Sequence, residues 1–576
     1  MTKAAAGMRG RSTGGAEERP DPRSSSRRLK WWGWGYQDQQ PSREQVEGIA
    51  RAVTERLGFE VDRVEQPVSL EDVELPASRV KAPTSLGALF SDDKYDRVAH
   101  ALGKAYRDVV RGFRGEFRDP PDLVAYPESP EDVDAVLSFC ADEGAAAIPY
   151  GGGTSVVGGV EPRMREDYPA VVTLDLRRMD RVLEVDPVSK AARIQAGATG
   201  PVLEGQLREH ELTLRHFPQS FEYSTLGGWI ATRAGGHFAT LYTHIDDLVE
   251  SVRAVTPAGE WESRRLPGSG AGPSPDRMML GSEGILGVIV DAWVRVRERP
   301  TQKVSCGVAF DRFLSGADAV REISQSGLNP SNCRLLDATE SETSSAGPPG
   351  KAVLVLGFES AHHPVDDSME LALDVARNHR GEPGEVKRSG AAPPGPEARR
   401  ESPAPSEPGE DPVNAWRHAF LFAPYLRDSL VACGILSDTF ETAVTWDRFE
   451  DFHAEVMEVA RRAAAEVTGA PVEGQGSPRV SCRFTHVYPD GPAPYYTVLA
   501  PARRGDEVVQ WDEIKAAVSD AVIGAGGTIT HHHAVGRDHR AWYDRQRPEP
   551  FADALRAAKR ELDPGALLNP GVLIDP

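Results

Sequence analysis

The sequence predicts an α+β protein with more than one domain. At 576 residues the chain is too long for a single hydrophobic core. Short β-branched segments and amphipathic helices follow one another without a regular βαβ repeat, which favours α+β over a doubly wound sheet. Hydrophobic residues make up 40% and charged residues 27%, as in ordinary globular proteins, and no apolar run approaches the ~20 residues of a membrane-spanning helix.

Charge and cysteine content argue against several classes of function. The formal net charge is -21 and no basic domain is present, so we expect no binding of nucleic acid. The five cysteines are scattered and form no CxxC pair, which argues against disulfides, zinc knuckles and iron–sulfur ligation. The N-terminus lacks an apolar signal segment, and we expect a cytoplasmic protein. Eight Lys or Arg against three Asp or Glu in the first 30 residues leave a peripheral contact with an anionic membrane open.

The N-terminal part is predicted to contain a tail and a helical extension. Residues 1–28 are rich in Ser, Gly and Ala, which is typical of a disordered tail. In the extension, residues 29–117, the aromatic cluster KWWGWGY should pack onto the main body as an anchor. The segment SREQVEGIARAVTERLG has apolar residues at helical spacing, with Ser42 as the N-cap. Residues 93–113 predict a further helix in the same way.

Residues 118–300 predict strands and helices joined by glycine-rich loops. Ser129, followed by acidic residues, marks a helix start. AVVTLDL, RVLEVD and ARIQAGA predict short strands, VLEGQLREHEL a helix and LVESVRAVTPAGE a hairpin. The glycine loops lie in PYGGGTSVVGG (149–159), QSFEYSTLGGWIATRAGG (219–236) and MMLGSEGILGVIVDAWVRVR (278–297). Glycines expose backbone N–H groups, so the first loop can hold a pyrophosphate, although a tight turn without a ligand fits this loop alone equally well.

The rest of the chain predicts a cap domain and a closing segment. Residues 301–525 form an α/β block, interrupted by a Pro-, Gly-, Ser- and Glu-rich stretch, 381–412, that we expect to be a mobile surface loop. The C-terminal segment, 526–576, contains TITHHH, whose β-branched texture predicts a strand. In a strand His531 and His533 would share one face. No further metal ligands lie near them in the sequence, so we predict no metal, and solvated or packing histidines are the plain alternative.

The three glycine loops, in this order and spacing, resemble the FAD-binding domain of the vanillyl-alcohol oxidase family, which has a PCMH-type FAD-binding domain and a cap domain. The resemblance implies noncovalent FAD, because the first loop lacks the histidine to which many relatives attach the flavin. The cofactor contacts that it implies are Pro149, Tyr150, Gly151, Gly152, Gly153, Thr154, Ser155, Gln219, Ser220, Ser224, Thr225, Thr232, Arg233, Ala234, Gly235, Glu283, Gly284, Leu286, Gly287, Val288 and Ile289. His216 is a further flavin-side candidate, with a packing role as the alternative.

From about residue 29 to about residue 575, the chain is similar to one branch of this family, the alkyldihydroxyacetonephosphate synthases. The matching segments are KWWGWGYQD, CRLLD, YLRDSLVACGILSDTFETAVTWDR, CRFTHVYPDGPAPYYT and HHHAVG. Gln219 departs from the pattern, since this branch has Asp there. The resemblance implies exchange of the acyl chain of acyl-dihydroxyacetone phosphate for a fatty alcohol, which forms an ether lipid precursor. The flavin would serve as an electron sink without net oxidation.

The resemblance also implies roles for single residues. Arg427 would bind the substrate phosphate through two parallel hydrogen bonds, and an ion pair with Asp428 or Asp438 is the alternative. Tyr495 would transfer protons, unless it only fills the core. Tyr496 must face the other side of the same strand, so only one of these rings can point to the flavin.

Four further residues complete the predicted site. His531, His532 and His533 would move the α-proton and hold the leaving carboxylate, and Arg334 would place the substrate or steady the flavin. Two other functions stay open. One is oxidation of a 2-hydroxy acid such as D-lactate or glycolate on the same fold, and the other is flavin binding without catalysis. The sequence does not decide the lengths of the acyl and alkyl chains of the substrates, or whether the protein forms a homodimer.

Overall fold

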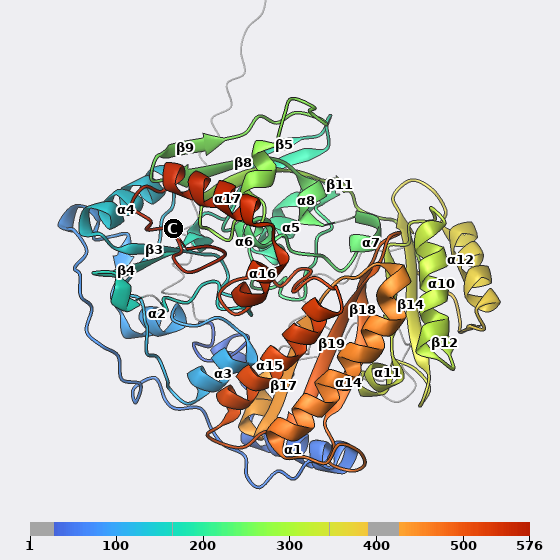
Figure 1. Ribbon diagram of the computed structural model, residues 1–576. Coiled ribbons are helices and arrows are strands. Elements are labelled where there is room, and N and C mark those ends of the chain that lie inside the picture. Colours follow the sequence, from blue (N-terminus) through green and yellow to red (C-terminus); the bar gives the residue numbers. More distant parts are fainter. Residues whose placement is uncertain (1–27, 164, 243, 345, 390–424, 576) are drawn as a thin grey trace, which may run out of the picture.

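Figure 1 shows the computed structural model, which confirms the predicted α+β class. It describes residues 28–163, 165–242, 244–344, 346–389 and 425–575. The predicted tail, except Arg28, and residues 390–412 of the predicted loop lie outside these ranges. The beginning of that loop is not irregular, because Glu382–Pro383 (β15) and Lys387–Ser389 (β16) pair with β12, Gln302–Phe310. No helix in the described ranges is both long and apolar enough to cross a bilayer.

Two sheets carry the glycine loops. The first has the order β1-β2-β4-β3, in which β2, β4 and β3 are parallel. The second is antiparallel, with the order β5-β6-β10-β8-β9, and contains the predicted hairpin as β8 and β9. Their strands are β1 Phe90–Ser91, β2 Leu123–Ala125, β3 Ala146–Tyr150, β4 Val171–Asp175, β5 Val182–Asp186, β6 Ala191–Gln195, β8 Val249–Thr256, β9 Gly259–Glu262 and β10 Val288–Arg295.

Short helices and a two-stranded ribbon complete this half of the molecule. Ser129 caps the helix that follows it, as predicted, by accepting a hydrogen bond from the backbone of Asp132. The elements are α4 Pro130–Glu143, α5 Gly200–Arg208, β7 Leu212–Thr213, α6 Leu226–Thr232, α7 Ala239–Tyr242, α8 Ile245–Leu248, α9 Pro275–Met279 and β11 Arg297–Glu298.

A third, eight-stranded sheet forms the other half. Its order is β15-β12-β14-β13-β18-β19-β17, with β16 beside β12. Helices α14 and α15 lie across one face of it (Figure 1). Its remaining elements are α10 Phe313–Gln325, β13 Asn332–Leu336, α11 Ala338–Thr343, β14 Ala352–Ser360, α12 Asp366–Asn378, β17 Ile435–Glu441, α14 Phe449–Thr468, β18 Arg479–Val487, β19 Pro492–Pro501 and α15 Glu507–Gly524.

The N-terminal extension packs onto the eight-stranded sheet. Its helices are α1 Arg43–Leu57, α2 Lys94–Ala99 and α3 Tyr106–Phe113. Trp31, Trp32 and Trp34 are buried in the same hydrophobic core as the strands of this sheet, as the aromatic anchor predicts. The single helix predicted for residues 93–113 is wrong. The helix is interrupted between α2 and α3. Gly103 lies in this interruption, and a Cβ there would lie 2.5 Å from the Ser155 carbonyl oxygen.

The C-terminal segment returns to the glycine-loop half. Its helices are α16 Arg540–Gln546 and α17 Glu549–Leu562. Val535, Leu568 and Val572 belong to the core that also contains the strands of the five-stranded sheet. The preceding helix, α15, packs on α14 over the large sheet. The three histidines therefore lie where the chain crosses from one half of the molecule to the other.

Candidate active site

The first glycine loop lies directly against the second. A Cβ on Gly152 would come within 1.8 Å of the Tyr223 carbonyl oxygen, and one on Gly151 within 2.2 Å of Thr225 Oγ1. Gly153 has a φ of +66°, in the left-handed region that glycine adopts most readily. These positions therefore admit no side chain, and the bare backbone of the loop lines a cavity.

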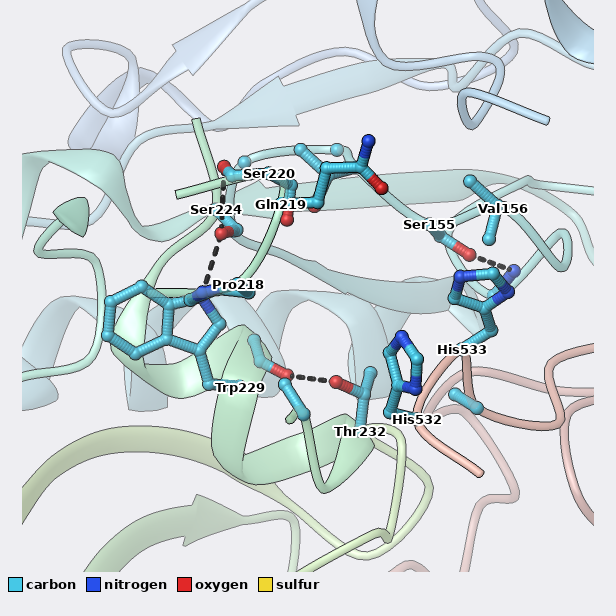
Figure 2. A pocket seen from close by; sticks show the side chains of 18 of the residues that line it. Ser155, Val156, Pro218, Gln219, Ser220, Ser224, Trp229, Thr232, His532 and His533 are labelled. Atoms are coloured by element: carbon cyan, nitrogen blue, oxygen red, sulfur yellow. Dashed lines mark hydrogen bonds between the residues drawn. The ribbon is translucent and has the colours of Figure 1, made fainter. Parts of the chain in front are cut away.

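This cavity has a volume of about 550 Å³ and lies between the glycine loops, the large sheet and the histidine segment. Figure 2 shows part of its lining, with the rings of His532 and His533 projecting from the C-terminal segment. Arg427 and Tyr495 also line it. The predicted cofactor contacts that line it are Pro149, Tyr150, Gly151, Gly152, Gly153, Thr154, Ser155, Gln219, Ser220, Ser224, Thr225, Thr232, Ala234, Gly235, Glu283, Gly284, Gly287 and Ile289.

Six predicted site residues do not line this cavity, and four of these lie in the core or face another cavity. Leu286 and Val288 are fully buried in the hydrophobic core beneath the third loop. Arg233 and His531 line a second cavity, of about 720 Å³. Arg233 is the C-cap residue that follows α6, in the left-handed conformation, and its guanidinium pairs with Asp246.

His216 and Arg334 lie behind the cavity wall. His216 packs against Trp229, with ring centroids 5.0 Å apart, and burial lowers its pKa to about 3. Because Trp229 lines the cavity, a neutral His216 supports that ring from behind. Arg334, on β13, is buried and donates from Nη2 to the His237 carbonyl oxygen at 3.4 Å. Burial and the neighbouring Arg483 lower its pKa to about 9.

The histidine triplet is not the strand that the sequence predicts. Residues 528–533 form an irregular bend, because the carboxylate of Glu441 takes the place of a neighbouring strand. Its oxygens accept hydrogen bonds from the backbone N–H groups of His531 at 2.8 Å, His532 at 3.1 Å and His533 at 2.9 Å. The predicted alternation of faces is therefore wrong. His532 and His533 line the first cavity, and His531 lines the second.

Glu441 is a functional candidate that the sequence reasoning missed. It ends β17 and is only 3% exposed, and it also accepts a hydrogen bond from Thr530 Oγ1 at 2.6 Å. Burial disfavours its charge, but His532 and His533 hold the pKa of Glu441 well below its ordinary value. A carboxylate directly after the aromatic Phe440, in the segment TFET, was the available signal.

Tyr495 and Tyr496 face opposite sides of β19, as the strand geometry predicts. Tyr495 lines the cavity and donates to Thr439 Oγ1 at 3.0 Å. The Tyr496 hydroxyl lies 3.2 Å from His453 Nδ1, in the core under α14. The ring of Tyr495 lies 5.5 Å from that of His533. Burial raises the pKa of Tyr495, and this keeps the phenol protonated at rest.

Arg483 is a second residue that the sequence reasoning did not single out. It lines the cavity, pairs with Glu340, and places its guanidinium carbon 4.0 Å from the centre of the Tyr495 ring. Its charge opposes the effect of burial on the pKa of Tyr495, and so does that of Arg427. The phenol therefore lies in a positive field that stabilises a developing phenolate.

The alternative ion-pair role of Arg427 is weakly supported by the geometry. Asp428 points away and forms a buried pair with Lys30, with Nζ and Oδ2 3.0 Å apart. Asp438 Oδ1 lies 3.9 Å from Arg427 Nη2, at the outer limit of an ion pair. The other guanidinium nitrogen donates to the Lys104 carbonyl oxygen at 3.2 Å. These contacts orient the guanidinium at the cavity without a close carboxylate.

The lining of the cavity fits FAD. The bare glycine backbone suits a pyrophosphate. Asn569 donates from Nδ2 to the carbonyl oxygens of Gly159, at 3.0 Å, and Glu283, at 2.7 Å. Its Oδ1 is buried at the cavity without a partner among the described residues, so it is available to a ligand donor. Burial raises the pKa of Glu283 to about 7, although backbone N–H groups of Val535 and Gly536 oppose this.

The glycine loop provides a direct test of cofactor binding. Gly152→Ala should abolish stable FAD binding, because its Cβ would lie 1.8 Å from a backbone oxygen and must displace the loop. Flavin absorbance of the purified variant measures the effect, expected as a loss of more than about 90% of the bound FAD on gel filtration. Gly205→Ala is the matched control, since that helical glycine meets nothing within 4 Å. Equal FAD content in both variants would contradict this assignment.

One group of histidines has the spacing of a metal site. Ring nitrogens of His486, His531 and His532 all lie within 4.8 Å of one another. His486 Nε2 lies 3.1 Å from the carbonyl oxygen of Gly236 and must carry a hydrogen, while Nδ1 of His531 and Nδ1 of His532 face each other at 3.0 Å. Since these nitrogens already take part in hydrogen bonds, we interpret the group as a hydrogen-bonded cluster. We therefore keep the prediction that it binds no metal.

Comparisons with known proteins agree with this geometry. Residues 121–263 match the model "FAD binding domain", and residues 299–573 match "FAD linked oxidases, C-terminal domain". The alkyldihydroxyacetonephosphate synthase of Dictyostelium discoideum is 30% identical over 84% of this chain and 78% of its own. A solved structure of an alkyldihydroxyacetonephosphate synthase is 26% identical, with a TM-score of 0.75 over 94% of this chain and 98% of that one.

A more distant relative bears on the alternative function. The glycolate oxidase subunit GlcD of Bacillus subtilis is 23% identical over 79% of this chain and 89% of its own. Its match is weaker than that of the synthase in both identity and coverage of this chain. The chain is an FAD-dependent enzyme with a PCMH-type FAD-binding domain and a cap, and it belongs to the alkyldihydroxyacetonephosphate synthase family.

Proposed function

We propose that this enzyme exchanges the acyl chain of acyl-dihydroxyacetone phosphate for a fatty alcohol. The observation that carries the proposal is the convergence of Arg427, Tyr495, His532 and His533 on the cavity that the glycine loops line. Each has a chemical counterpart in the substrate. A guanidinium suits the phosphate dianion, and a phenol and two imidazoles suit the proton transfers beside the ketone.

The overall exchange is redox-neutral and releases a proton. The bond between C1 and the ester oxygen breaks, and its electron pair leaves on the carboxylate. The alcohol oxygen bonds to C1 and loses its hydrogen. Since a carboxylic acid is ionised at neutral pH, each turnover yields one ether, one carboxylate and one proton. FAD, when bound, supplies an electron sink at C1 that the protein side chains lack.

The side chains of the cavity divide the remaining work. Arg427 holds the phosphate and thereby fixes C1 relative to Tyr495. Tyr495, in the field of Arg427 and Arg483, moves the proton on C1 next to the ketone. His532 and His533 bind the leaving carboxylate and accept the alcohol proton. The apolar side chains Leu426, Leu430 and Leu499, which also line the cavity, keep water from the reacting carbon.

Anaerobic incubation of the FAD-loaded enzyme with palmitoyl-dihydroxyacetone phosphate and hexadecanol tests this function. We expect the ether product and free palmitate by mass spectrometry, with the flavin oxidised before and after. A 2-hydroxy acid such as D-lactate or glycolate, added in a parallel reaction, should leave the flavin oxidised. Bleaching by the hydroxy acid without any ether formation would replace the proposal by the oxidoreductase alternative.

Arg427→Lys should raise KM for the ketone phosphate by about 10- to 100-fold and change kcat less, because an ammonium cannot make two parallel hydrogen bonds to phosphate. Steady-state kinetics with the alcohol saturating measures this split. The control is Arg503→Lys, whose side chain is 62% exposed and pairs only with Asp506 among the ion pairs of the described residues. An unchanged KM in Arg427→Lys would remove this residue from phosphate binding.

We further propose that the enzyme is cytoplasmic. We also propose that it contacts membranes peripherally, because its substrates carry long acyl and alkyl chains that partition into lipid. We also propose that the enzyme forms a homodimer and that it does not bind nucleic acid. Co-sedimentation with phosphatidylcholine vesicles, with and without anionic lipid, tests the membrane contact. Light scattering after gel filtration tests the dimer.

A further inference from the structure

A chain of four hydrogen-bonded side chains connects the two cavities. His532 Nδ1 lies 3.0 Å from His531 Nδ1, and His531 Nε2 lies 2.8 Å from the Tyr488 hydroxyl. The Tyr488 hydroxyl in turn bonds His244 Nε2. His532 lines the first cavity, and the other three line the second. Thr232, Glu283 and Ala534 line both cavities and form the wall that this chain crosses.

The surroundings at the two ends fix the direction of these hydrogen bonds. At the inner end, His532 Nδ1 lies 3.2 Å from a carboxylate oxygen of Glu441, so Nδ1 carries the hydrogen and Nε2 is an acceptor. At the outer end, His244 Nδ1 lies 3.3 Å from the carbonyl oxygen of Arg233, so this nitrogen also carries a hydrogen and Nε2 accepts. The Nδ1 hydrogen of His532 is then shared between Glu441 and His531 Nδ1, and the next hydrogens point outward, from His531 to Tyr488 and from Tyr488 to His244.

The middle of the chain is suited to pass a proton on. Burial lowers the pKa of His531 well below its ordinary value, so the ring rests neutral with one acceptor and one donor nitrogen. His486 packs 4.9 Å from the ring of His531 and keeps it in place. The second cavity reaches the surface, because Arg277 and Asp247 on its lining have side chains that are 51% and 58% exposed.

We propose that these four side chains form a proton relay, which carries the proton released in each turnover from the first cavity to the second. The inference rests on the proposed function, whose balance yields one proton for each ether. His532 Nε2 accepts the proton from the alcohol, and its Nδ1 hydrogen passes to His531 Nδ1. The Nε2 hydrogen of His531 passes to the Tyr488 oxygen, whose own hydrogen passes to His244 Nε2. His244 then loses its Nδ1 hydrogen to water in the second cavity.

The relay assigns roles that the substrate cavity alone does not explain. His531, which the sequence placed in the catalytic set, has no contact with the first cavity and acts through His532. Tyr488 and His244 gain a function, although neither lines the first cavity. Arg233 holds the outer end through its backbone and not through its guanidinium.

Tyr488→Phe tests the relay, because it removes the central hydroxyl and keeps the ring. Ether formation and proton release, followed together with a pH indicator in weak buffer, should both fall about 10- to 100-fold. Added imidazole should restore turnover, since the small base can reach His531 through the second cavity. Tyr543→Phe, which alters another tyrosine on the lining of that cavity, should behave as wild type and show no response to imidazole.

The outcomes separate the relay from a structural role and from the proposed function. Wild-type turnover of Tyr488→Phe in weak buffer, or a loss that imidazole does not reverse, overturns the relay. If the wild-type enzyme forms no ether, the proposed function fails, and ring-¹⁵N-labelled histidine decides the relay by NMR. Nδ1–H tautomers of His532 and His244 are expected, and the opposite tautomer at either ring overturns the direction of transfer.

Discussion

Tyr495→Phe is expected to lower kcat for ether formation by at least about 100-fold while FAD stays bound. The phenol of Tyr495 lines the cavity together with His532 and His533. The substitution removes this proton-transferring group and keeps the ring that Arg483 covers at 4.0 Å. Binding of the ketone phosphate should therefore change little, and the loss should fall on kcat.

The neighbouring tyrosine provides the matched control. Tyr496→Phe removes a hydroxyl that is just as buried but lies on the opposite face of β19, near His453. We expect its turnover to stay within a factor of about two of the wild type, with a loss of stability of about 1 kcal/mol for the lost hydrogen bond. Single-turnover kinetics and thermal unfolding measure both properties. Equal turnover losses in the two variants would assign Tyr495 to packing instead of proton transfer.

Local chemistry made part of this site predictable. The role of the glycines in the first loop follows from their conformational freedom alone. The opposite directions of Tyr495 and Tyr496 follow from the alternation of side chains along a strand. Both patterns lie within a few residues of sequence. The predicted FAD contacts came instead from the family resemblance, which assigned most residues of each matching loop segment to the cofactor. It therefore included Leu286 and Val288, whose side chains point into the core.

The missed residues depend on contacts that are distant in sequence. Glu441 accepts hydrogen bonds from residues about 90 positions away, and without that carboxylate TITHHH has the composition of a strand. Arg483 becomes part of the site only because β18 pairs with β19 and brings it over Tyr495. In the same way, the packing of the N-terminal aromatic cluster on the large sheet is set by tertiary contacts. Single-sequence patterns do not record such pairings.

Glu441→Gln should disorder the histidine segment and strongly lower turnover. The carboxylate accepts hydrogen bonds from three consecutive backbone N–H groups and from Thr530 Oγ1. An amide of the same shape turns an NH₂ group toward these donors and leaves at least one buried donor unpaired. We expect the free energy of unfolding to fall by about 3 kcal/mol and kcat by at least about 100-fold. Urea unfolding and steady-state kinetics measure the two effects.

Acid titration gives the same substitution a second readout. The folded-state pKa of Glu441 lies well below its ordinary value of 4.5, so its charge stabilises the fold fully above that pH. This contribution decreases as the pH falls below about 4.5 toward the folded-state pKa. The wild type should therefore lose stability on acidification, and Glu441→Gln should lose less, because its side chain does not titrate.

Glu507→Gln is the control for general damage to a buried carboxylate. Glu507 is 4% exposed and accepts from the backbone of Gly505 at 2.7 Å, but it lines neither cavity. This variant should lose stability and keep wild-type turnover below its unfolding temperature. If Glu441→Gln also kept its turnover, the histidines would not need their backbone anchor. The inner end of the relay would then have to be fixed by something other than this carboxylate, since Glu441 is the group that sets the hydrogen on His532 Nδ1.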